Sequence, residues 1–348
     1  MTTVVHTADV HLDPDRPDRM EGLRSVMQAA ADSGAELLTI GGDLFETPED
    51  LEALRTTLRN EVFTEDAVPT LLIPGNHDEA AFRGNLDFGP SCSVVLDHPF
   101  GTWTSAADDV RICAVPYVDR LDSDLRLALA DRDPFDGLDV LMIHGSLDAP
   151  GAAPGAGEEA GRAYCPLSSA LLERLGFDVY LAGHYHSPQI HAIGGGGEFV
   201  YPGTPVSTRR SETGLRKVCR LDADGVSLDP LGTPHYAQFD RTIIPGREEE
   251  VFTELDGWVD AQHEEAMLMG ALVGFTGLEE TEVADRLGQV PWHDLQNDVL
   301  GAEQLLEDPL YGRFRDVLQE QQWDVSTTTA VDQLVLEVMG ALRSMGDR

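Results

Sequence analysis

Lysine is almost absent from this chain of 348 residues, in which Lys217 is the only one. Acidic residues number 62 against 24 basic ones, which gives a formal net charge of -38 at pH 7. The acidic residues are spread along the whole chain, a pattern that favours a halophilic protein adapted to very high intracellular salt over one with a basic partner. At molar salt the Debye length is only about 3 Å, so this charge does not exclude a nucleic acid as partner.

Long apolar runs are also missing. No stretch approaches the roughly 20 apolar residues that a membrane-spanning helix needs, so we expect no membrane partner. The N-terminus carries no basic region ahead of an apolar one, as a secretory signal would, and we expect a cytoplasmic protein. The four cysteines are widely spaced and form no C-x-x-C pair, which favours reduced structural thiols.

What the chain does contain is a regular alternation of apolar runs and helical patterns up to about residue 220. Helical spacing predicts helices over 17–33, 48–63 and 167–175. Apolar runs predict strands between them, over 1–12, 37–43, 68–74, 110–116, 138–144 and 177–182. This alternation predicts a layered α/β architecture with polar residues at the C-terminal ends of the strands.

The pattern changes after Pro234. A strand over 236–244, a helix over 248–261 and a strand over 266–276 predict a small α+β domain. From about residue 291 onward the spacing predicts helices, and the last of them either packs on the chain's own body or docks on a partner helix. We therefore expect three parts: a domain over 1–232, a capping domain over 233–290 and a helical segment over 291–348.

The end of one predicted strand is the main indication of function. The apolar run from residue 37 delivers Asp43 just after Gly41 and Gly42, and two glycines let the backbone turn sharply there. Four further stretches place Asp, Asn or His at strand ends: Asp9 and His11, Asn76 and His77, His144, and His184 with His186. Nitrogen and oxygen donors of these types suit a pair of borderline divalent ions. A carboxylate has two oxygens, so we expect Asp43 to bridge the two ions.

The ordered series D-x-H, G-G-D, G-N-H-D, H-G and G-H-x-H resembles that of the calcineurin-like metallophosphoesterase superfamily, over nearly all of residues 4–215. The resemblance implies a four-layer α-β-β-α metallophosphoesterase sandwich. It also implies one ion held by Asp9, His11, Asp43 and His186, and a second held by Asp43, Asn76, His144 and His184. The donor set favours two Mn²⁺ ions and leaves Zn²⁺ and Fe²⁺ open.

In the same resemblance His77 is not a metal ligand but the group that contacts the phosphate and assists the leaving oxygen. Two ions polarise phosphoryl oxygens and lower the pKa of a water between them, and an imidazole suits protonation of the leaving oxygen. Asp78 either orients His77 or caps the loop.

Narrower features resemble one branch, the SbcD / MRE-eleven family of DNA double-strand-break repair nucleases. They are the segments His6-Thr7-Ala8-Asp9-Val10-His11-Leu12, Gly42-Asp43-Leu44-Phe45, Pro116-Tyr117, Gly183-His184-Tyr185-His186-Ser187-Pro188-Gln189 and Tyr201-Pro202-Gly203-Thr204-Pro205. The resemblance implies a capping domain that helps to position DNA, a homodimer, and an SMC-like coiled-coil ATPase as partner. The chain departs from that branch at Glu46, where a histidine is expected, and in a C-terminal region that is short for an ATPase-binding segment.

The densest basic cluster in this acidic chain follows that last segment and comprises Arg209, Arg210, Arg216, Lys217 and Arg220. Its members either contact DNA phosphates, which would position a duplex without reading its sequence, or pair with the chain's own carboxylates. The leading interpretation is a Mn²⁺-dependent DNA exonuclease or endonuclease that processes ends in double-strand-break repair. The alternatives are a metallophosphoesterase acting on nucleotides or phosphoproteins, and a silent scaffold, which is disfavoured because no ligand is missing.

Overall fold

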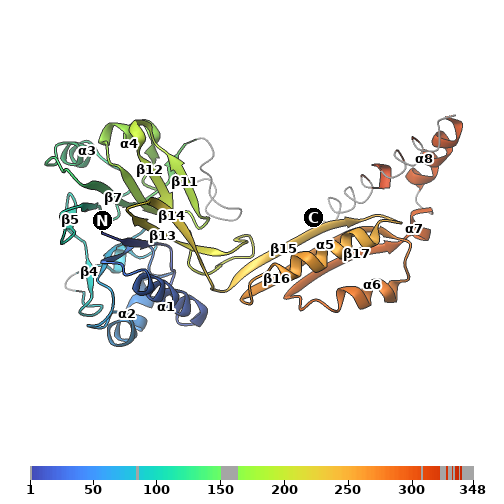
Figure 1. Ribbon diagram of the computed structural model, residues 1–348, viewed down its shortest axis with the longest axis horizontal. Coiled ribbons are helices and arrows are strands. Elements are labelled where there is room, and N and C mark those ends of the chain that lie inside the picture. Colours follow the sequence, from blue (N-terminus) through green and yellow to red (C-terminus); the bar gives the residue numbers. More distant parts are fainter. Residues whose placement is uncertain are drawn as a thin grey trace. The chain divides into compact units, whose positions relative to one another are not determined.

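The computed structural model describes residues 2–83, 86–149, 164–306 and 309–321, and a few positions between 327 and 338. The chain divides into two compact units, Met1–His235 and Tyr236–Arg348 (Figure 1). No helix in the described part of the chain combines the length and the apolar character needed to cross a bilayer.

The first unit contains two six-stranded sheets. The first sheet has the order β14-β13-β1-β2-β3-β4, with β1 (Val4–Thr7), β2 (Leu37–Gly41), β3 (Thr70–Ile73), β4 (Cys92–Val94), β13 (Arg216–Asp222) and β14 (Gly225–Leu231). In it β1, β2, β3 and β4 run parallel, while β13 is antiparallel to β1. The strand C-termini of β1 to β3 therefore meet at one edge.

The second sheet has the order β11-β12-β10-β7-β6-β5, with β5 (Gly101–Thr104), β6 (Val110–Ala114), β7 (Leu138–His144), β10 (Val179–Gly183), β11 (Gln189–Ala192) and β12 (Glu198–Tyr201). Its central strands β6, β7, β10 and β12 are parallel, and the edge strands β5 and β11 are antiparallel to their neighbours. A short pair, β8 (Leu147–Asp148) and β9 (Leu167–Ser168), lies outside both sheets.

The two sheets pack face to face through a shared apolar core. Val4 and Ile73 of the first sheet lie in one buried cluster with Val140 and Leu181 of the second. Outer helices cover the other faces, with α1 (Pro17–Asp32) and α2 (Pro48–Thr57) on the first sheet and α3 (Ser123–Ala130) and α4 (Ser169–Leu175) on the second (Figure 1). The predicted α-β-β-α sandwich is confirmed.

The helix and strand patterns of the first unit reproduce most of the predicted elements. The helix predicted over 48–63 is present as α2, which is followed by one π-helical turn, Leu58–Val62. Two single 3-10 turns, Glu79–Ala81 and Gly194–Gly196, complete the helical segments.

The second unit is built on a sheet of order β15-β16-β17. Its elements are β15 (His235–Ile243), α5 (Glu248–Asp260), β16 (Ala266–Thr276), α6 (Glu280–Leu287) and β17 (Asp294–Gly301), followed by α7 (Ala302–Leu306) and α8 (Pro309–Glu320). Phe252 of α5 and Val283 of α6 share one core with Phe239 and Leu272 of the sheet.

The prediction of helix from residue 291 is wrong at β17, which pairs parallel to β16. The strand packs Leu295 and Val299 against the core, while Asn297 between them is exposed. Apolar residues four apart also fit a helix, so the spacing hid the strand. Most of the helical pattern predicted near the end of the chain lies outside the described residues.

Candidate metal centre

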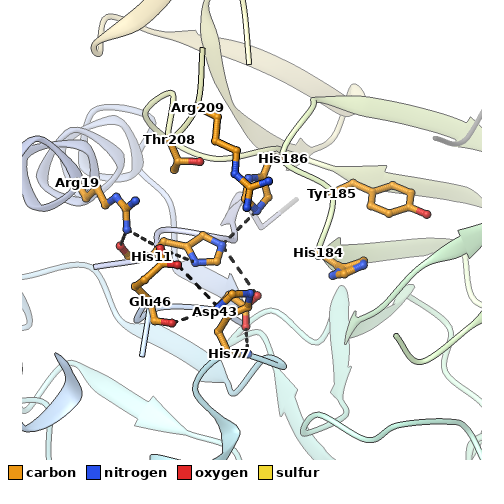
Figure 2. A pocket seen from close by; sticks show the side chains of 10 residues that line it. All are labelled: His11, Arg19, Asp43, Glu46, His77, His184, Tyr185, His186, Thr208 and Arg209. Atoms are coloured by element: carbon orange, nitrogen blue, oxygen red, sulfur yellow. Dashed lines mark hydrogen bonds and ion pairs between the residues drawn. The ribbon is translucent and has the colours of Figure 1, made fainter. Parts of the chain in front are cut away.

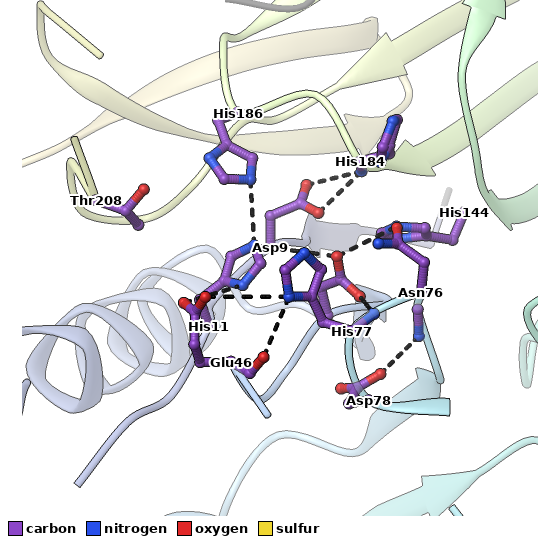
Figure 3. Close-up of polar contacts among 12 residues, drawn as sticks. Asp9, His11, Glu46, Asn76, His77, Asp78, His144, His184, His186 and Thr208 are labelled. Atoms are coloured by element: carbon purple, nitrogen blue, oxygen red, sulfur yellow. Dashed lines mark hydrogen bonds and ion pairs between the residues drawn. The ribbon is translucent and has the colours of Figure 1, made fainter. Parts of the chain in front are cut away.

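The predicted site residues follow the C-terminal ends of five strands that belong to both sheets. Asp9 and His11 follow β1, Asp43 follows β2, Asn76 and His77 follow β3, His144 ends β7, and His184 and His186 follow β10 (Figure 3). The sheets approach each other closely at two glycines, since a Cβ on Gly183 would lie 2.3 Å from the Gly41 carbonyl oxygen. Small residues at this point allow the two sets of strand ends to share one site.

The backbone at the site is unusual. Asp9, His11 and Asp43 have φ values of 54°, 51° and 50°, and His184 has φ of 112°. Residues with a Cβ seldom occupy this region, and such strain concentrates at functional sites. The turns aim the four side chains inward instead of continuing the strands.

One donor group lies around Asp9, His11 and His186, whose ligand atoms are all within 4.8 Å of one another. The Nε2 atoms of His11 and His186 face each other at 3.1 Å. Asp9 accepts two hydrogen bonds from the His184 backbone N–H, at 2.9 and 3.0 Å. We refer to this group as site A.

A second donor group, site B, lies around Asp9, Asp43 and His144, again within 4.8 Å. His144 Nε2 is 3.4 Å from Asp43 Oδ2 and 2.9 Å from Asn76 Oδ1. The His184 ring lies beside it, with its centroid 5.5 Å from that of His144. Asp43 thus stands between the two groups, being also 4.0 Å from His11 Nε2.

The pKa shifts of His11, His184 and Asp43 suit metal ligation. Burial lowers the pKa of His11 well below its usual value and that of His184 to about 3, so both rings are neutral. Burial opposes ionisation of Asp43, but the nearby His144 and His11 outweigh it and hold the pKa of Asp43 below its usual range. Neutral imidazoles and ionised carboxylates are the forms that bind metal ions. Two buried Nε2 atoms that face each other with carboxylates around them therefore fit a divalent cation.

His77 lies at the open side of this centre and is half-buried. Its backbone N–H donates to Asp43 Oδ1 at 2.9 Å, and its Nδ1 is 3.1 Å from the Glu46 carbonyl oxygen. A ligand atom of His77 also lies within 4.8 Å of His11 and Asp43, so its ring is close to both sites. Asp78 is buried and accepts from the N–H groups of Gly75 and Phe45, at 2.8 and 3.1 Å. Of the two roles left open for Asp78, these bonds favour the capping of the loop.

A pocket leads to the centre and is lined by His11, Arg19, Asp43, Glu46, His77, His184, Tyr185, His186, Thr208 and Arg209 (Figure 2). Glu46, where the resemblance led us to expect a histidine, is paired with Arg19 at 2.6 Å. The same Arg19 Nη1 donates to the His11 carbonyl oxygen at 2.5 Å. The carboxylate and the guanidinium thus form one ion pair on this wall of the pocket.

The predicted basic cluster does not form one surface. Arg209 and Arg210 are exposed and Lys217 is half-buried on β13. Arg220 pairs with Asp222 and Asp229, so here the intramolecular alternative holds. Arg216 is only 1% exposed and donates to the carbonyl oxygens of His186 and Thr204. The predicted DNA contact by Arg216 is therefore wrong, because no phosphate can reach its buried guanidinium.

One residue of the site was missed from the sequence. Glu212 is buried, and its Oε1 lies 2.7 Å from His186 Nδ1. Burial raises the pKa of the Glu212 carboxyl, but the hydrogen bond and charge of His186 outweigh this effect and lower the pKa to about 2. The only signal in the sequence was its position shortly after the Tyr201–Pro205 segment, within the basic cluster.

Comparison with known proteins agrees with this geometry. The model of the calcineurin-like phosphoesterase family matches residues 2–188. The UDP-2,3-diacylglucosamine hydrolase of Stenotrophomonas maltophilia is 27% identical over 259 residues, covering 66% of this chain and 98% of that protein.

Among solved structures, the TT1561 protein of Thermus thermophilus has a TM-score of 0.45 and 17% identity, with coverage of 66% of this chain and 98% of that one. A purple acid phosphatase from yellow lupin seeds has a TM-score of 0.43 and 16% identity, with coverage of 66% and 51%. The family match spans more than half of the chain and includes the strand ends that carry the site. The chain belongs to the calcineurin-like phosphoesterase family, hydrolases that use divalent metal ions.

Proposed function

We propose that this protein is a DNA nuclease of the SbcD / MRE-eleven type, which hydrolyses phosphodiester bonds at DNA ends in double-strand-break repair. The observation that carries the proposal is the exposed Arg209 at the rim of the pocket that leads to the donor groups. In a chain of net charge -38, a guanidinium at this place favours a substrate with several phosphates. The five sequence segments shared with that branch, and a second compact unit after the first, support the same assignment.

The proposal includes two ions. One would be held by Asp9, His11, Asp43 and His186, and the other by Asp43, Asn76, His144 and His184. When bound, two divalent ions polarise the phosphoryl oxygens and lower the pKa of water. We propose Mn²⁺ for both, since a mixed set of histidine nitrogens and carboxylate and amide oxygens suits it, with Zn²⁺ and Fe²⁺ as alternatives.

His77 supplies the proton. Its Nδ1–H donates to the Glu46 carbonyl oxygen at 3.1 Å, which orients the ring in the pocket that it lines. In the protonated form, Nε2–H donates to the oxygen that leaves the phosphorus. The Asp43 carboxylate, which accepts from the His77 backbone N–H, fixes the distance between this acid and the ion sites.

The same proposal assigns roles outside the site. The second unit would help to position DNA, the enzyme would act as a homodimer in the cytoplasm of a halophile, and an SMC-like coiled-coil ATPase would be its partner. These roles rest on the resemblance to the nuclease branch.

A second candidate is a phosphoesterase acting on nucleotides. It is favoured by the similarity to a UDP-2,3-diacylglucosamine hydrolase along 98% of that protein's length. Glu46, in place of the histidine of the nuclease branch, also marks a difference at the pocket wall. A nucleotide diphosphate is smaller than a duplex and would need no second unit to hold it.

The deciding experiment is cleavage of end-labelled linear duplex and single-stranded DNA in molar KCl with Mn²⁺. Wild type is compared with Asp43→Ala, His77→Ser and the exposed His263→Ser as a control in the second unit. We expect metal-dependent shortening that Asp43→Ala abolishes, that His77→Ser lowers by about 10²- to 10⁴-fold, and that His263→Ser leaves unchanged. Hydrolysis of a UDP-linked substrate or a small diester without any cleavage of DNA would overturn the nuclease in favour of the second candidate.

A further inference from the structure

Two imidazoles of site A face each other, and each has a glutamate behind it. His186 Nδ1 lies 2.7 Å from Glu212 Oε1, whereas His11 Nδ1 lies 3.5 Å from Glu46 Oε2 and makes no hydrogen bond within the described residues. A ring that donates from Nδ1 keeps its Nε2 lone pair free for a metal ion. Figure 3 shows these Nε2 atoms directed at each other beside Asp9.

Of the two glutamates, Glu212 is the one that is fixed. It is 2% exposed, and its oxygens accept from the Thr208 backbone N–H at 2.6 Å, the Thr208 hydroxyl at 2.7 Å and the Thr204 hydroxyl at 3.3 Å. These three donors are neutral, so they orient the carboxylate without cancelling its charge. Glu46, by contrast, is half-buried and lies 2.6 Å from the Arg19 guanidinium, which offsets its charge.

The backbone around Glu212 is fixed as well. The Ser207 hydroxyl donates to the Glu212 carbonyl oxygen at 2.6 Å. Arg216 donates to the His186 carbonyl oxygen and to the Thr204 hydroxyl, which joins both ends of the contact through one buried side chain. His186 and Glu212 therefore keep their relative position when the ion is absent.

In the part of the chain that the structure describes, His144 of site B is supported differently. His144 Nδ1 is 2.9 Å from the Gly41 carbonyl oxygen, a neutral acceptor. Its Nε2 lies 2.9 Å from Asn76 Oδ1, the oxygen of a neutral amide, and 3.4 Å from the Asp43 carboxylate. In the proposed assignment the two ion sites share Asp43, but His186 has the Glu212 carboxylate at its Nδ1 whereas His144 has a neutral carbonyl oxygen there.

We propose that Glu212 is a positioning residue that holds His186 in its metal-binding tautomer and makes site A the tighter of the two ion sites. The inference rests on the assignment of the two ion sites made under the proposed function. Removal of such a carboxylate behind a metal-binding histidine typically costs 10- to 100-fold in affinity. Site A would then retain its ion when site B has lost its own.

The test is metal binding in the absence of substrate. Apoprotein made with chelator is titrated with Mn²⁺ by calorimetry and by the electron paramagnetic resonance of free Mn²⁺, for wild type, Glu212→Gln and Glu212→Ala. The exposed Glu173→Ala on α4 is the matched control. Unfolding of each apoprotein is followed separately, which reports any purely structural effect.

We expect wild type to bind one ion more tightly than the other. Glu212→Ala should weaken the tight ion by about 10- to 100-fold and leave the weak one unchanged. Glu212→Gln keeps an acceptor for the His186 Nδ1–H but loses the negative charge, so its affinity for the tight ion should lie between those of wild type and Glu212→Ala. Glu173→Ala should bind as wild type does.

Three results would overturn the proposal. They are unchanged affinity in both Glu212 variants, equal weakening of the binding of both ions, and a Glu212→Gln variant that binds no better than Glu212→Ala. If Glu212→Ala does not fold, Glu212→Gln decides, because wild-type affinity in that variant would also overturn it. Binding of fewer than two ions by wild type would instead remove the metal assignment itself. Since no DNA is present, failure of the nuclease proposal leaves this result unaffected.

Discussion

Several contacts and an unusual backbone conformation constrain Asp43. It stands on backbone with φ of 50°, its Oδ1 accepts from the His77 N–H, and its Oδ2 faces His144. A non-glycine residue held in the left-handed region costs about 1–3 kcal/mol, so the surrounding loop must fix it. The loop does so through Gly75, whose Cα approaches this turn closely.

Replacing Gly75 should disable the centre without removing a ligand. A Cβ on Gly75 would lie 2.1 Å from Asp43 Oδ1 and 2.4 Å from the Asp43 nitrogen, so the carboxylate must shift. A displacement of about 1 Å at a reacting centre can cost 10²-fold, and we expect Gly75→Ala to lower kcat/KM on a small phosphodiester by about that factor. Gly257→Ala in α5, where a Cβ meets nothing within 4 Å, is the control. Equal activity in the two variants would contradict this role of Gly75.

His6 gives the pH dependence of stability a measurable contribution. It is fully buried between the sheets, with Nδ1 at 2.9 Å from Thr39 Oγ1 and Nε2 at 3.3 Å from the Ala182 carbonyl oxygen. Burial lowers its pKa to about 4. As the pH falls, His6 is protonated near pH 6.5 in the unfolded chain but only near pH 4 in the folded protein. The free energy of unfolding is therefore highest above pH 6.5 and decreases as the pH falls between these two values.

We expect this contribution to amount to about 2 kcal/mol between pH 7.5 and pH 5. Urea unfolding in chelator at constant molar KCl measures it, with His6→Gln as a variant that cannot titrate. Wild type should lose more free energy of unfolding than His6→Gln over this interval by about that amount. Parallel pH profiles for the two proteins would show that His6 does not titrate as its burial requires.

At the level of elements, local pattern was enough to predict the strands that end at the metal centre. The buried runs over 140–143 in β7 and 179–182 in β10 are apolar, and a candidate metal ligand stands at the end of each, since His144 ends β7 and His184 follows β10. The contact of Glu212 with His186 joins residues 26 positions apart, and it depends on how the chain folds back after β12. Hydrophobic periodicity does not show where the chain folds back on itself. The ligands could therefore be predicted from the sequence, but the hydrogen bond between Glu212 and His186 could not.

Arg216 illustrates the same limit. Its place in a basic cluster suggested a surface that binds phosphates. In the structure Arg216, the first residue of β13, is buried and donates hydrogen bonds to the carbonyl oxygens of Thr204 and His186. The sequence alone does not show whether a charged side chain is buried or exposed. The structure instead makes this arginine a part of the fold.

Arg216→Met should therefore destabilise the protein. The methionine keeps an apolar stem of similar length but leaves the carbonyl oxygens of His186 and Thr204 without this donor. Buried unsatisfied groups cost about 1–3 kcal/mol each, and we expect the free energy of unfolding to fall by about 2–4 kcal/mol. Chemical denaturation with the exposed Arg210→Met as control measures the difference. Weaker DNA binding at unchanged stability would instead restore the predicted phosphate contact.

At the scale of the whole molecule, several arginines in the described part of the chain form ion pairs on the surface. Arg24 pairs with Glu21 and Glu61, and Arg247 pairs with Glu250. Exposed pairs of this kind contribute about 0–1 kcal/mol each, so they do not offset a net charge of -38. The remaining carboxylates repel one another, and this repulsion destabilises the compact state unless salt screens it.

The free energy of unfolding should therefore rise with ionic strength. The Debye length falls from about 10 Å at 0.1 M salt to about 3 Å at 1 M, which removes repulsion between all but neighbouring carboxylates. Relief of about 2 kcal/mol corresponds to a rise in Tm of about 4–8 °C for a domain of this size. Thermal unfolding in chelator from 0.1 M to 1 M KCl measures the rise, and choline chloride at equal ionic strength should produce the same effect because screening depends on charge alone. A rise in KCl but not in choline chloride would mean that the carboxylates bind potassium ions specifically, and no rise in either would mean that the ion pairs already balance the charge.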